Sequence, residues 1–256
     1  MGGCCIAWTV FMCRIAAFIG APCRLDTFLS APPHSLARQA WDARETISST
    51  VNADGWGVAW YDDAHVPAVY RHILPIWADG NLDALSRSLT RPVWLANVRS
   101  ATSGLGTDHA NTQPFTGDGL IFVHNGYIER FSEGIRARMR AEIDPAIEED
   151  INGNTDSEYL FALLRSQPGT PAEKLARAHE RTLALLGETP SRKALLNMIV
   201  TDGQAMTGLR SSVNAPAPSL YVHHDWQGGQ VVASEAFDDS PGWSAVSAES
   251  FVTVSA

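Results

Sequence analysis

The apolar residues of this chain occur mostly in short runs that end at polar or glycine-containing turns. Runs of this length, rich in Val, Ile, Phe and Trp, are typical of buried β-strands. The pattern predicts strands over residues 13–19, 55–61, 69–74, 93–98 and 120–124, and a second group over residues 195–201, 205–209, 220–223, 230–233 and 251–254.

Between these two groups of strands the apolar residues change to helical spacing. Residues 154–158 form a predicted N-terminal cap for a helix over residues 159–165, and Pro171 begins a second helix that ends near Gly187. Strands followed by helices and then strands favour two mainly antiparallel sheets with helices packed outside, rather than a doubly wound parallel sheet. The predicted fold class is therefore α+β.

Length and charge limit the function classes. A chain of 256 residues suits one large domain with a sizeable core. Its formal net charge of −9 argues against nucleic acid or an anionic membrane as the main partner, because both are bound through concentrated Lys and Arg.

All four cysteines lie within the first 23 residues. A disulfide framework would spread cysteines along the chain, so a reducing cytoplasm is the expected location. The set contains no C-x-x-C pair and too few ligands for structural zinc, and we expect no metal or other cofactor. The apolar N-terminal run lacks a basic segment before it and is interrupted by Arg14, which argues against a signal peptide.

Cys13 directly follows Met12. If translation starts at Met12, removal of that methionine leaves Cys13 with a free α-amino group. An α-amine titrates near pH 8 and a thiol near 8.5, so the amine can accept the thiol proton and activate the sulfur without a catalytic histidine. The alternative is that Cys13 is a small buried apolar residue within a strand.

The tripeptide His124-Asn125-Gly126 follows a predicted apolar strand. A strand tip can present the Asn125 side-chain amide and the Gly126 backbone N–H to one point, as in an oxyanion hole. The alternative is an Asn-Gly hairpin turn. His124 itself is expected to be structural.

Two further polar clusters also stand at the ends of predicted elements. Arg99, with Ser100 and Thr102 beside it, follows the strand over residues 93–98 and can bind a carboxylate; otherwise it is a surface arginine in a loop. Asp156 stands at a predicted helix start, where its carboxylate either binds a substrate ammonium or caps the helix.

The order of these motifs is more informative than any one of them. M-C-R, N-A-D-G-W-G, V-R-S-A-T, H-N-G and T-D-S-E follow one another at domain-scale spacing. In this the chain resembles the class II glutamine amidotransferases, a family of N-terminal-nucleophile hydrolases. Within it, A-P-P-H-S-L, T-V-N-A-D-G-W-G-V-A-W-Y and A-S-E-A-F-D-D are most similar to the ergothioneine-biosynthesis γ-glutamyl hydrolases.

The resemblance implies a four-layer α-β-β-α sandwich built on two mainly antiparallel sheets. It implies that Cys13 is the nucleophile and its own α-amine the base, and that Asn125 and Gly126 are the oxyanion donors. Residues 13–256 would form the hydrolase domain. Residues 1–12 would be an extension absent from the mature protein, since an acylated Cys13 has no free amine.

The resemblance also implies how a γ-glutamyl group is bound. Arg99 would bind the α-carboxylate, with Ser100 and Thr102 close by, and Asp156 would bind the α-ammonium. Gln113 stands where these amidotransferases often have a histidine, and it is given no role.

The resemblance favours a free-standing hydrolase of a small γ-glutamyl molecule such as γ-glutamyl hercynylcysteine sulfoxide, because little chain follows in which a synthase domain could lie. A glutaminase subunit that feeds ammonia to a separate partner is the first alternative, and a catalytically inactive γ-glutamyl-binding protein is the second. A homo-oligomer is compatible with the sequence. The tryptophans are expected mainly in the core, the alternative being an aromatic wall for a trimethylammonium group: Trp41, Trp56, Trp60, Trp77 and Trp94.

Overall fold

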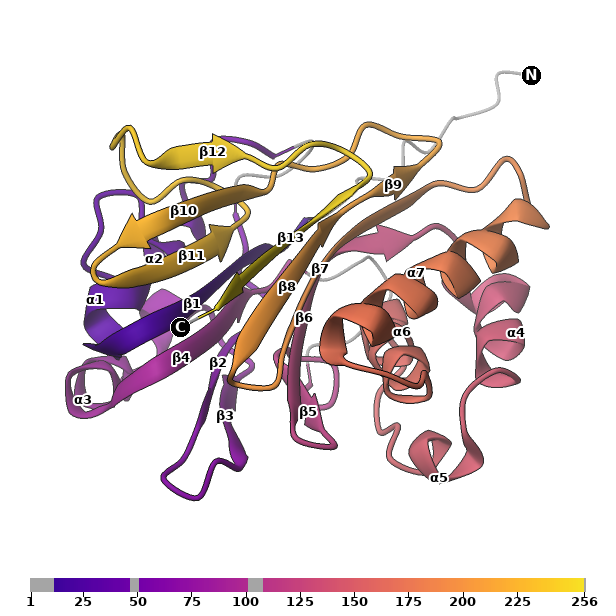
Figure 1. Cartoon of the computed structure of the whole chain (residues 1–256), viewed down its shortest axis with the longest axis horizontal. Coiled ribbons are helices and arrows are strands. Elements are labelled where there is room, and N and C mark those ends of the chain that lie inside the picture. The colour runs from indigo at the N-terminus through magenta and orange to yellow at the C-terminus, as the bar shows by residue number, and fades with distance from the viewer. Residues whose placement is uncertain (1–11, 47–50, 101–107, 256) are drawn as a thin grey trace.

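The computed structural model describes residues 12–46, 51–100 and 108–255, and it consists of two sheets with helices on their outer faces (Figure 1). Every strand pair in both sheets is antiparallel. Together with the helices, the two sheets form the four-layer α-β-β-α sandwich of the N-terminal-nucleophile hydrolase type, so the predicted fold class is confirmed.

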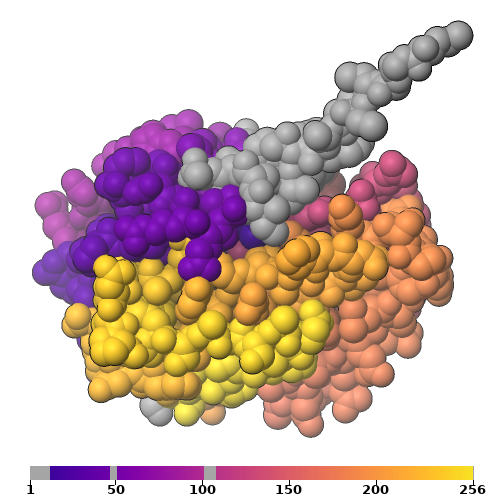
Figure 2. Space-filling view, turned by 90° about the horizontal axis from the view of Figure 1, so that it is seen from above, coloured from indigo at the N-terminus to yellow at the C-terminus, as the bar shows by residue number. Residues whose placement is uncertain are grey.

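The first sheet, sheet A, has seven strands in the order β12-β10-β11-β1-β4-β2-β3. Its strands are β1 (Arg14–Arg24), β2 (Trp56–Tyr61), β3 (Pro67–His72), β4 (Thr90–Val98), β10 (Tyr221–Trp226), β11 (Gly229–Ala233) and β12 (Trp243–Ala245). Strand β11, from the last part of the chain, pairs directly with β1, and Figure 2 shows indigo and yellow segments on the same half of the molecule.

The second sheet, sheet B, has six strands, five of them in the order β13-β8-β7-β6-β5, with β9 paired to β7. Its strands are β5 (Phe115–Gly117), β6 (Leu120–Ile128), β7 (Ala194–Thr201), β8 (Ala205–Arg210), β9 (Ser212–Val213) and β13 (Ser250–Ser255).

The helices form the two outer layers (Figure 1). Sheet A is covered by α1 (Leu25–Leu29), α2 (Leu36–Gln39) and α3 (Leu82–Ser88), with the turn η1 (Ile76–Ala78) nearby. Sheet B is covered by η2 (Phe131–Ile135), α4 (Arg136–Arg140), α5 (Pro145–Glu148), α6 (Asp156–Arg165) and α7 (Pro171–Gly187). None of the described helices is long and apolar enough to cross a membrane.

The middle strands have apolar side chains on both faces because each sheet is covered on both sides. On β1, Ile15 and Ala17 point between the sheets, whereas Ala16 and Phe18 point toward α1 and α2. This explains why the sequence of β1 is a continuous apolar run instead of an alternating one. Cys13, immediately before β1, continues the face of Ile15 that points between the sheets.

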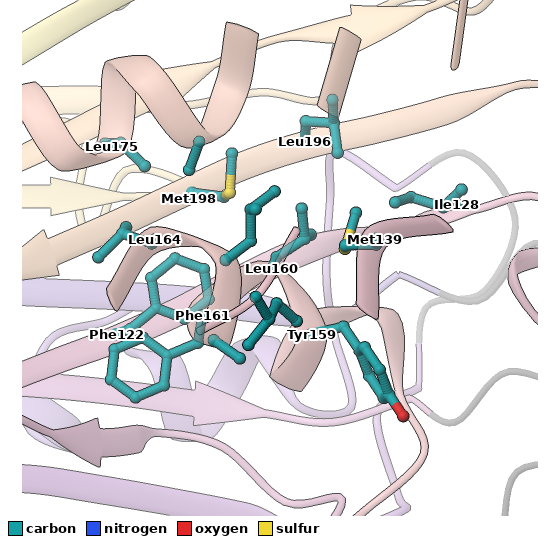
Figure 3. Packing of buried hydrophobic residues seen from close by; sticks show 14 of the residues in the cluster. Phe122, Ile128, Met139, Tyr159, Leu160, Phe161, Leu164, Leu175, Leu196 and Met198 are labelled. Carbon is teal, nitrogen blue, oxygen red and sulfur yellow. The ribbon is translucent and has the colours of Figure 1, made fainter. Parts of the chain in front are cut away.

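Helices α6 and α7 pack their apolar faces on the outer side of sheet B (Figure 3). Phe161 of α6 stacks on Phe122 of β6 with 5.3 Å between ring centroids. Thr155 caps α6 by accepting a hydrogen bond from the N–H of Glu158, and this fixes where the helix begins. The predicted N-terminal cap and second helix agree with α6 and α7.

The tryptophans are divided between core and surface. Trp56 and Trp94 are fully buried in the cluster between sheet A and its helices, and Trp60 packs against that cluster. Core packing is therefore confirmed for these three. Trp41 and Trp77 remain about half exposed, at 48% and 50%.

A buried ion cluster fixes the first residues of β1 to the C-terminal part of the chain. The Arg14 guanidinium lies 3.2 Å from a carboxylate oxygen of Glu235, and the other oxygen of Glu235 is 2.6 Å from Nε2 of His34. The backbone N–H groups of Arg44 and Glu45 also donate to this carboxylate. Arg14 is fully buried and Glu235 is 1% exposed, so each depends on the other for charge compensation.

We expect Glu235→Gln to lower the free energy of unfolding by about 3–5 kcal/mol at neutral pH, because it leaves the buried Arg14 charge uncompensated. Burial alone would raise the pKa of Glu235, but its hydrogen bonds with His34, Arg44 and Glu45 and the charge of Arg14 together lower it. The ionised carboxylate therefore stabilises the fold fully above its unfolded-state pKa, and this contribution disappears as the pH falls through the lowered folded-state pKa.

Urea denaturation of the wild type and of Glu235→Gln over a pH series checks this expectation. Asp42→Asn is the matched control, because Asp42 forms a surface ion pair with Arg38 and should change stability by less than about 1 kcal/mol. Equal effects of the two substitutions at neutral pH would contradict the role given to Glu235.

Candidate functional site

The end of β4 and the start of β1 meet because the two strands are antiparallel neighbours, with Arg14 opposite Val98. Cys13 therefore lies beside the residues that follow β4, and its Sγ is 3.8 Å from the carbonyl oxygen of Ser100. Cys13 and Ser100 are both buried, at 8% and 6% exposure. The structure thus brings together the predicted nucleophile and one of the predicted substrate-binding residues.

Arg99 is buried, so its interpretation as a surface arginine is wrong. Its N–H donates to the carbonyl of Gly55 at 2.8 Å, and its carbonyl accepts from the N–H of Asp54 at 3.0 Å. Its guanidinium also donates to the carbonyl oxygen of Asp54. The turn before β2 therefore holds the Arg99 side chain in the interior near Cys13. Thr102 lies outside the described residues.

The groups around the Cys13 thiol change its pKa in opposite directions. Burial raises the pKa of the Cys13 thiol above its ordinary value. A backbone hydrogen bond from Ser100, the positive charges of Arg99 and Arg14 and the side-chain amide of Asn97 favour the thiolate and offset part of this rise.

Asn125 lies inside β6, which continues to Ile128 and pairs with β7 from Ile121 to Ile128. The prediction that the apolar strand ends at His124 is wrong, and so is the hairpin-turn alternative. Asn125 shares the face of Ile121 and Val123, which points between the sheets toward β1 and β4. It is fully buried, and within the described chain neither atom of its side-chain amide has a hydrogen-bond partner.

The backbone of β6 also presents an N–H at Gly126. Alternate residues of a strand direct their N–H groups to the same edge, here the edge away from β7. On this edge the N–H of His124 donates to the side chain of Gln113, and the N–H of Ile128 donates to Asp156. The N–H of Gly126 lies between them, beyond the described ladder of β5, which ends at Phe122.

Position 126 also requires glycine. A Cβ there would lie 1.8 Å from the carbonyl oxygen of Leu195 on β7, far inside van der Waals contact. Any side chain at this position would therefore push β6 away from β7 and displace Asn125.

Asp156 is the first residue of α6, and Thr155, not Asp156, caps that helix. The Asp156 carboxylate accepts from the N–H of Ile128 at 2.5 Å and from the N–H of Ser157 at 2.8 Å. It is half-buried at the end of β6 that carries Asn125 and Gly126. The structure therefore places the predicted carboxylate beside the strand segment that carries the predicted oxyanion donors.

The chain is similar to known proteins over most of its length. The family model for class II glutamine amidotransferases matches residues 32–217. A γ-glutamyl-hercynylcysteine sulfoxide hydrolase from Mycolicibacterium smegmatis is 30% identical over 233 residues, which cover 91% of each chain.

This chain belongs to the class II glutamine amidotransferase family.

Other members of this family are similar over different shares of their length. The probable glutamine amidotransferase DUG3 of Saccharomyces cerevisiae is 34% identical over 196 residues, which are 73% of this chain and 53% of that protein. A solved glutamine aminotransferase class-II domain protein from Silicibacter pomeroyi has a TM-score of 0.70 and 27% identity, with 95% of both chains covered. The resemblance identified from the ordered motifs is confirmed.

His124 has the structural role expected for it. It is fully buried on the outer face of β6; its Nδ1 lies 2.8 Å from the hydroxyl of Ser157 and its Nε2 lies 3.0 Å from the carbonyl of Leu195. Burial lowers its pKa. The described residues also contain no group of three His, Cys, Asp or Glu side chains placed to share a metal ion.

Gln113 links the two halves of the site, although sequence reasoning assigned it no role. Its side-chain Nε2 donates to the carbonyl of His124 at 2.9 Å, and its Oε1 accepts from the N–H of His124 at 2.5 Å. Its own carbonyl passes so close to β2 that a Cβ at Gly57 would lie 2.3 Å from it. One residue therefore contacts sheet A at β2 and holds the β6 backbone next to Asn125.

Sequence reasoning also missed the buried polar residues around Cys13. Asn97 interrupts the apolar strand V-W-L-A-N-V at a position that faces the other sheet, and Glu235 follows the apolar end of β11. In each case the usable signal was a polar residue at the end of an otherwise buried strand. Neither signal specifies a partner, because Asn97 and Glu235 meet Cys13 and Arg14 only in the folded chain.

We expect Gln113→Leu to lower the free energy of unfolding by about 2–6 kcal/mol, because it leaves the buried N–H and C=O of His124 unpaired at about 1–3 kcal/mol each. Chemical denaturation measures the loss. Gln204→Leu is the control, since Gln204 is exposed and its replacement should change stability by no more than about 0.5 kcal/mol. Unchanged stability in Gln113→Leu would show that the two hydrogen bonds are unimportant.

Proposed function

We propose that this chain hydrolyses a γ-glutamyl amide bond through a thioester on Cys13. The observation that carries the proposal is the unpartnered, fully buried amide of Asn125, beside the edge N–H of Gly126, on the sheet that faces Cys13. A buried amide donor without a partner in the described chain suits a ligand atom that gains negative charge during a reaction, and the N–H of Gly126 is the second donor proposed for that atom. The family membership supports the same chemistry.

The proposed substrate-binding groups carry opposite charges. Arg99 would bind the α-carboxylate of the glutamyl group, with Ser100 and Thr102 beside it, and Asp156 would bind the α-ammonium. Arg99 lies at the sheet A end and Asp156 at the sheet B end of the site. Charged hydrogen bonds of this kind contribute about 1.5–3 kcal/mol each, and together they would orient the γ-carbonyl toward Cys13.

The reaction would proceed in two steps. The α-amine of Cys13 takes the thiol proton, and the thiolate attacks the γ-carbonyl carbon to form a C–S bond, while Asn125 and Gly126 hold the oxyanion. Collapse of this intermediate breaks the C–N bond, and the ammonium returns its proton to the leaving amine. Water then attacks the thioester, giving its proton to the amine, and glutamate and the free thiol are released.

This mechanism requires that the chain through Met12 be removed. In the full-length chain the nitrogen of Cys13 is part of a peptide bond to Met12, whose side chain is fully buried. An amide nitrogen is not basic enough to accept the thiol proton. The active species would therefore begin at Cys13.

The favoured substrate is γ-glutamyl hercynylcysteine sulfoxide. The Mycolicibacterium smegmatis hydrolase carries that substrate in its name and covers nearly the whole of this chain. Glutamine is the second candidate, because the similar yeast protein is described as a probable glutamine amidotransferase.

We expect the intact mass of the active protein to match a chain that begins at Cys13. This protein should release glutamate from γ-glutamyl hercynylcysteine sulfoxide much faster than from glutamine. Cys13→Ala should reduce release below detection and abolish the acyl adduct seen by mass spectrometry after acid quenching. Cys23→Ala is the matched control: Cys23 lies near the far end of β1, away from Cys13, and burial raises its pKa to about 11. Turnover by Cys13→Ala would end the proposal, and faster turnover of glutamine would favour the second candidate.

We expect Asn125→Ala to lower kcat by about 10²–10³ with little change in KM, because the oxyanion forms only after attack. Asn125→Asp should be impaired similarly, since it keeps the shape of asparagine but lacks the donor. Steady-state kinetics of both variants test the assignment. An Asn125→Asp enzyme as fast as the wild type would remove Asn125 from the oxyanion hole.

A further inference from the structure

A second buried amide, that of Asn97, lies on the same inner face as Cys13. Asn97 belongs to β4 and pairs directly with Ile15 of β1, and its neighbours on this face are apolar residues such as Leu95 and Val93. It is fully buried, and within the described chain neither amide atom makes a hydrogen bond of ordinary geometry. An unsatisfied buried amide costs about 1–3 kcal/mol, so packing alone gives no reason for an asparagine here.

The register places this amide next to the Cys13 sulfur. Cys13 is two residues before Ile15 and on the same face, so Asn97 is its diagonal neighbour on the adjacent strand. Diagonal pairs are within reach of a side chain of this length. The Asn97 amide is close enough to favour the thiolate and so to lower the pKa of the Cys13 thiol.

A hydrogen-bond donor from a side chain would stabilise the ionised sulfur of Cys13. The thiol donates to the carbonyl oxygen of Ser100, but a thiolate has no proton to donate and a carbonyl can only accept. Once the sulfur is ionised, this contact with the carbonyl therefore becomes unfavourable, and the backbone hydrogen bond from Ser100 is the main interaction at that residue that favours the thiolate. A neighbouring N–H donor would replace the lost interaction.

We propose that Asn97 is a positioning residue for the nucleophile: its amide Nδ2 donates a hydrogen bond to the Cys13 thiolate and holds the sulfur toward the space between the sheets. The proposal rests on Cys13 being the nucleophile. Asn97 would act on the sulfur before substrate reacts, whereas Asn125 would act on the substrate oxygen, so the two amides have separate roles.

The other charges around the sulfur are the same in any Asn97 variant. Arg99 and Arg14 both favour the thiolate, and Arg14 is paired with Glu235. The inward-facing residues of β6 and β7 opposite carry no charge at neutral pH: Ile121, Val123, Asn125, Tyr127, Leu195, Asn197, Ile199 and Thr201. Tyr127 is the titratable one among them, and burial raises its pKa, which keeps the phenol neutral. A change in the pKa of the thiol on replacing Asn97 therefore reports on the Asn97 amide.

The test is the pH dependence of alkylation of Cys13 by iodoacetamide in the purified protein, followed by peptide mass spectrometry. Asn97→Leu removes both amide atoms at similar volume, and we expect it to raise the thiol pKa by about one unit. At a pH below the pKa this means about tenfold less thiolate and about tenfold slower alkylation. Asn97→Asp, which offers acceptors in place of the donor, should raise the pKa further.

Asn197→Leu is the matched control. Asn197 is also a fully buried asparagine, on β7, but its Nδ2 donates to the carbonyls of Pro218 and Ser219. Its replacement should lower the melting temperature without moving the alkylation profile. Where Asn97→Leu does not fold, Asn97→Ala provides the same measurement with a smaller side chain.

An alkylation profile of folded Asn97→Leu or Asn97→Ala that superimposes on the wild-type profile would overturn the proposal. This outcome is distinct from failure of the proposed function, because alkylation needs no γ-glutamyl substrate. A protein that alkylates as expected but releases no glutamate would uphold the role of Asn97 and reject the hydrolase. A protein that hydrolyses with an unchanged thiol pKa in Asn97→Leu would do the reverse.

Discussion

Backbone hydrogen bonds between β1 and β4 hold Arg14 opposite Val98 and Ile15 opposite Asn97. This register decides which groups can meet Cys13, because side chains alternate between the two faces of a strand. A slip of one residue would turn Cys13 toward the helices and bring the Arg14 charge between the sheets. The apolar faces on both sides of β1 make such a slip costly, so hydrophobic packing ultimately fixes the position of the sulfur.

Some of the buried polar groups around the site have hydrogen-bond partners, and others do not. Gln113 satisfies both backbone groups of His124, and Glu235 compensates Arg14 with support from His34. By contrast, the side-chain amides of Asn97 and Asn125 have no hydrogen-bond partners of ordinary geometry within the described chain. The saturated groups stiffen the ends of β1 and β6, and that rigidity keeps the unsatisfied amides from relaxing toward other partners.

Much of the fold could be predicted because the apolar residues of long helices and strands recur with a clear spacing. The helix ending at Gly187 and the middle strands agree closely with the sequence pattern, whereas one-turn helices such as α2 and α5 are too short to show one. The end of β6 was misplaced because Asn-Gly is a strong turn signal, and tertiary pairing with β7 overrides it. Cys13, Arg99, Asn125 and Asp156 could be selected from ordered motifs. The contacts of Gln113 and Asn97 could not, because they depend on how the two sheets face each other.

The edge of β6 that extends beyond the end of β5 has a consequence for self-association. A row of unpaired N–H groups on an outer strand can recruit an extended segment from another molecule, and a long flat margin invites fibril-like stacking. Along β6 this row is interrupted, because the N–H of His124 donates to the Gln113 side chain and the N–H of Ile128 donates to the Asp156 carboxylate. Between these two residues, only Gly126 directs its N–H to this edge. One N–H group is too few to start a ladder of β-sheet hydrogen bonds. The side chains on either side of the candidate oxyanion hole therefore also protect this edge against pairing with a strand from another molecule.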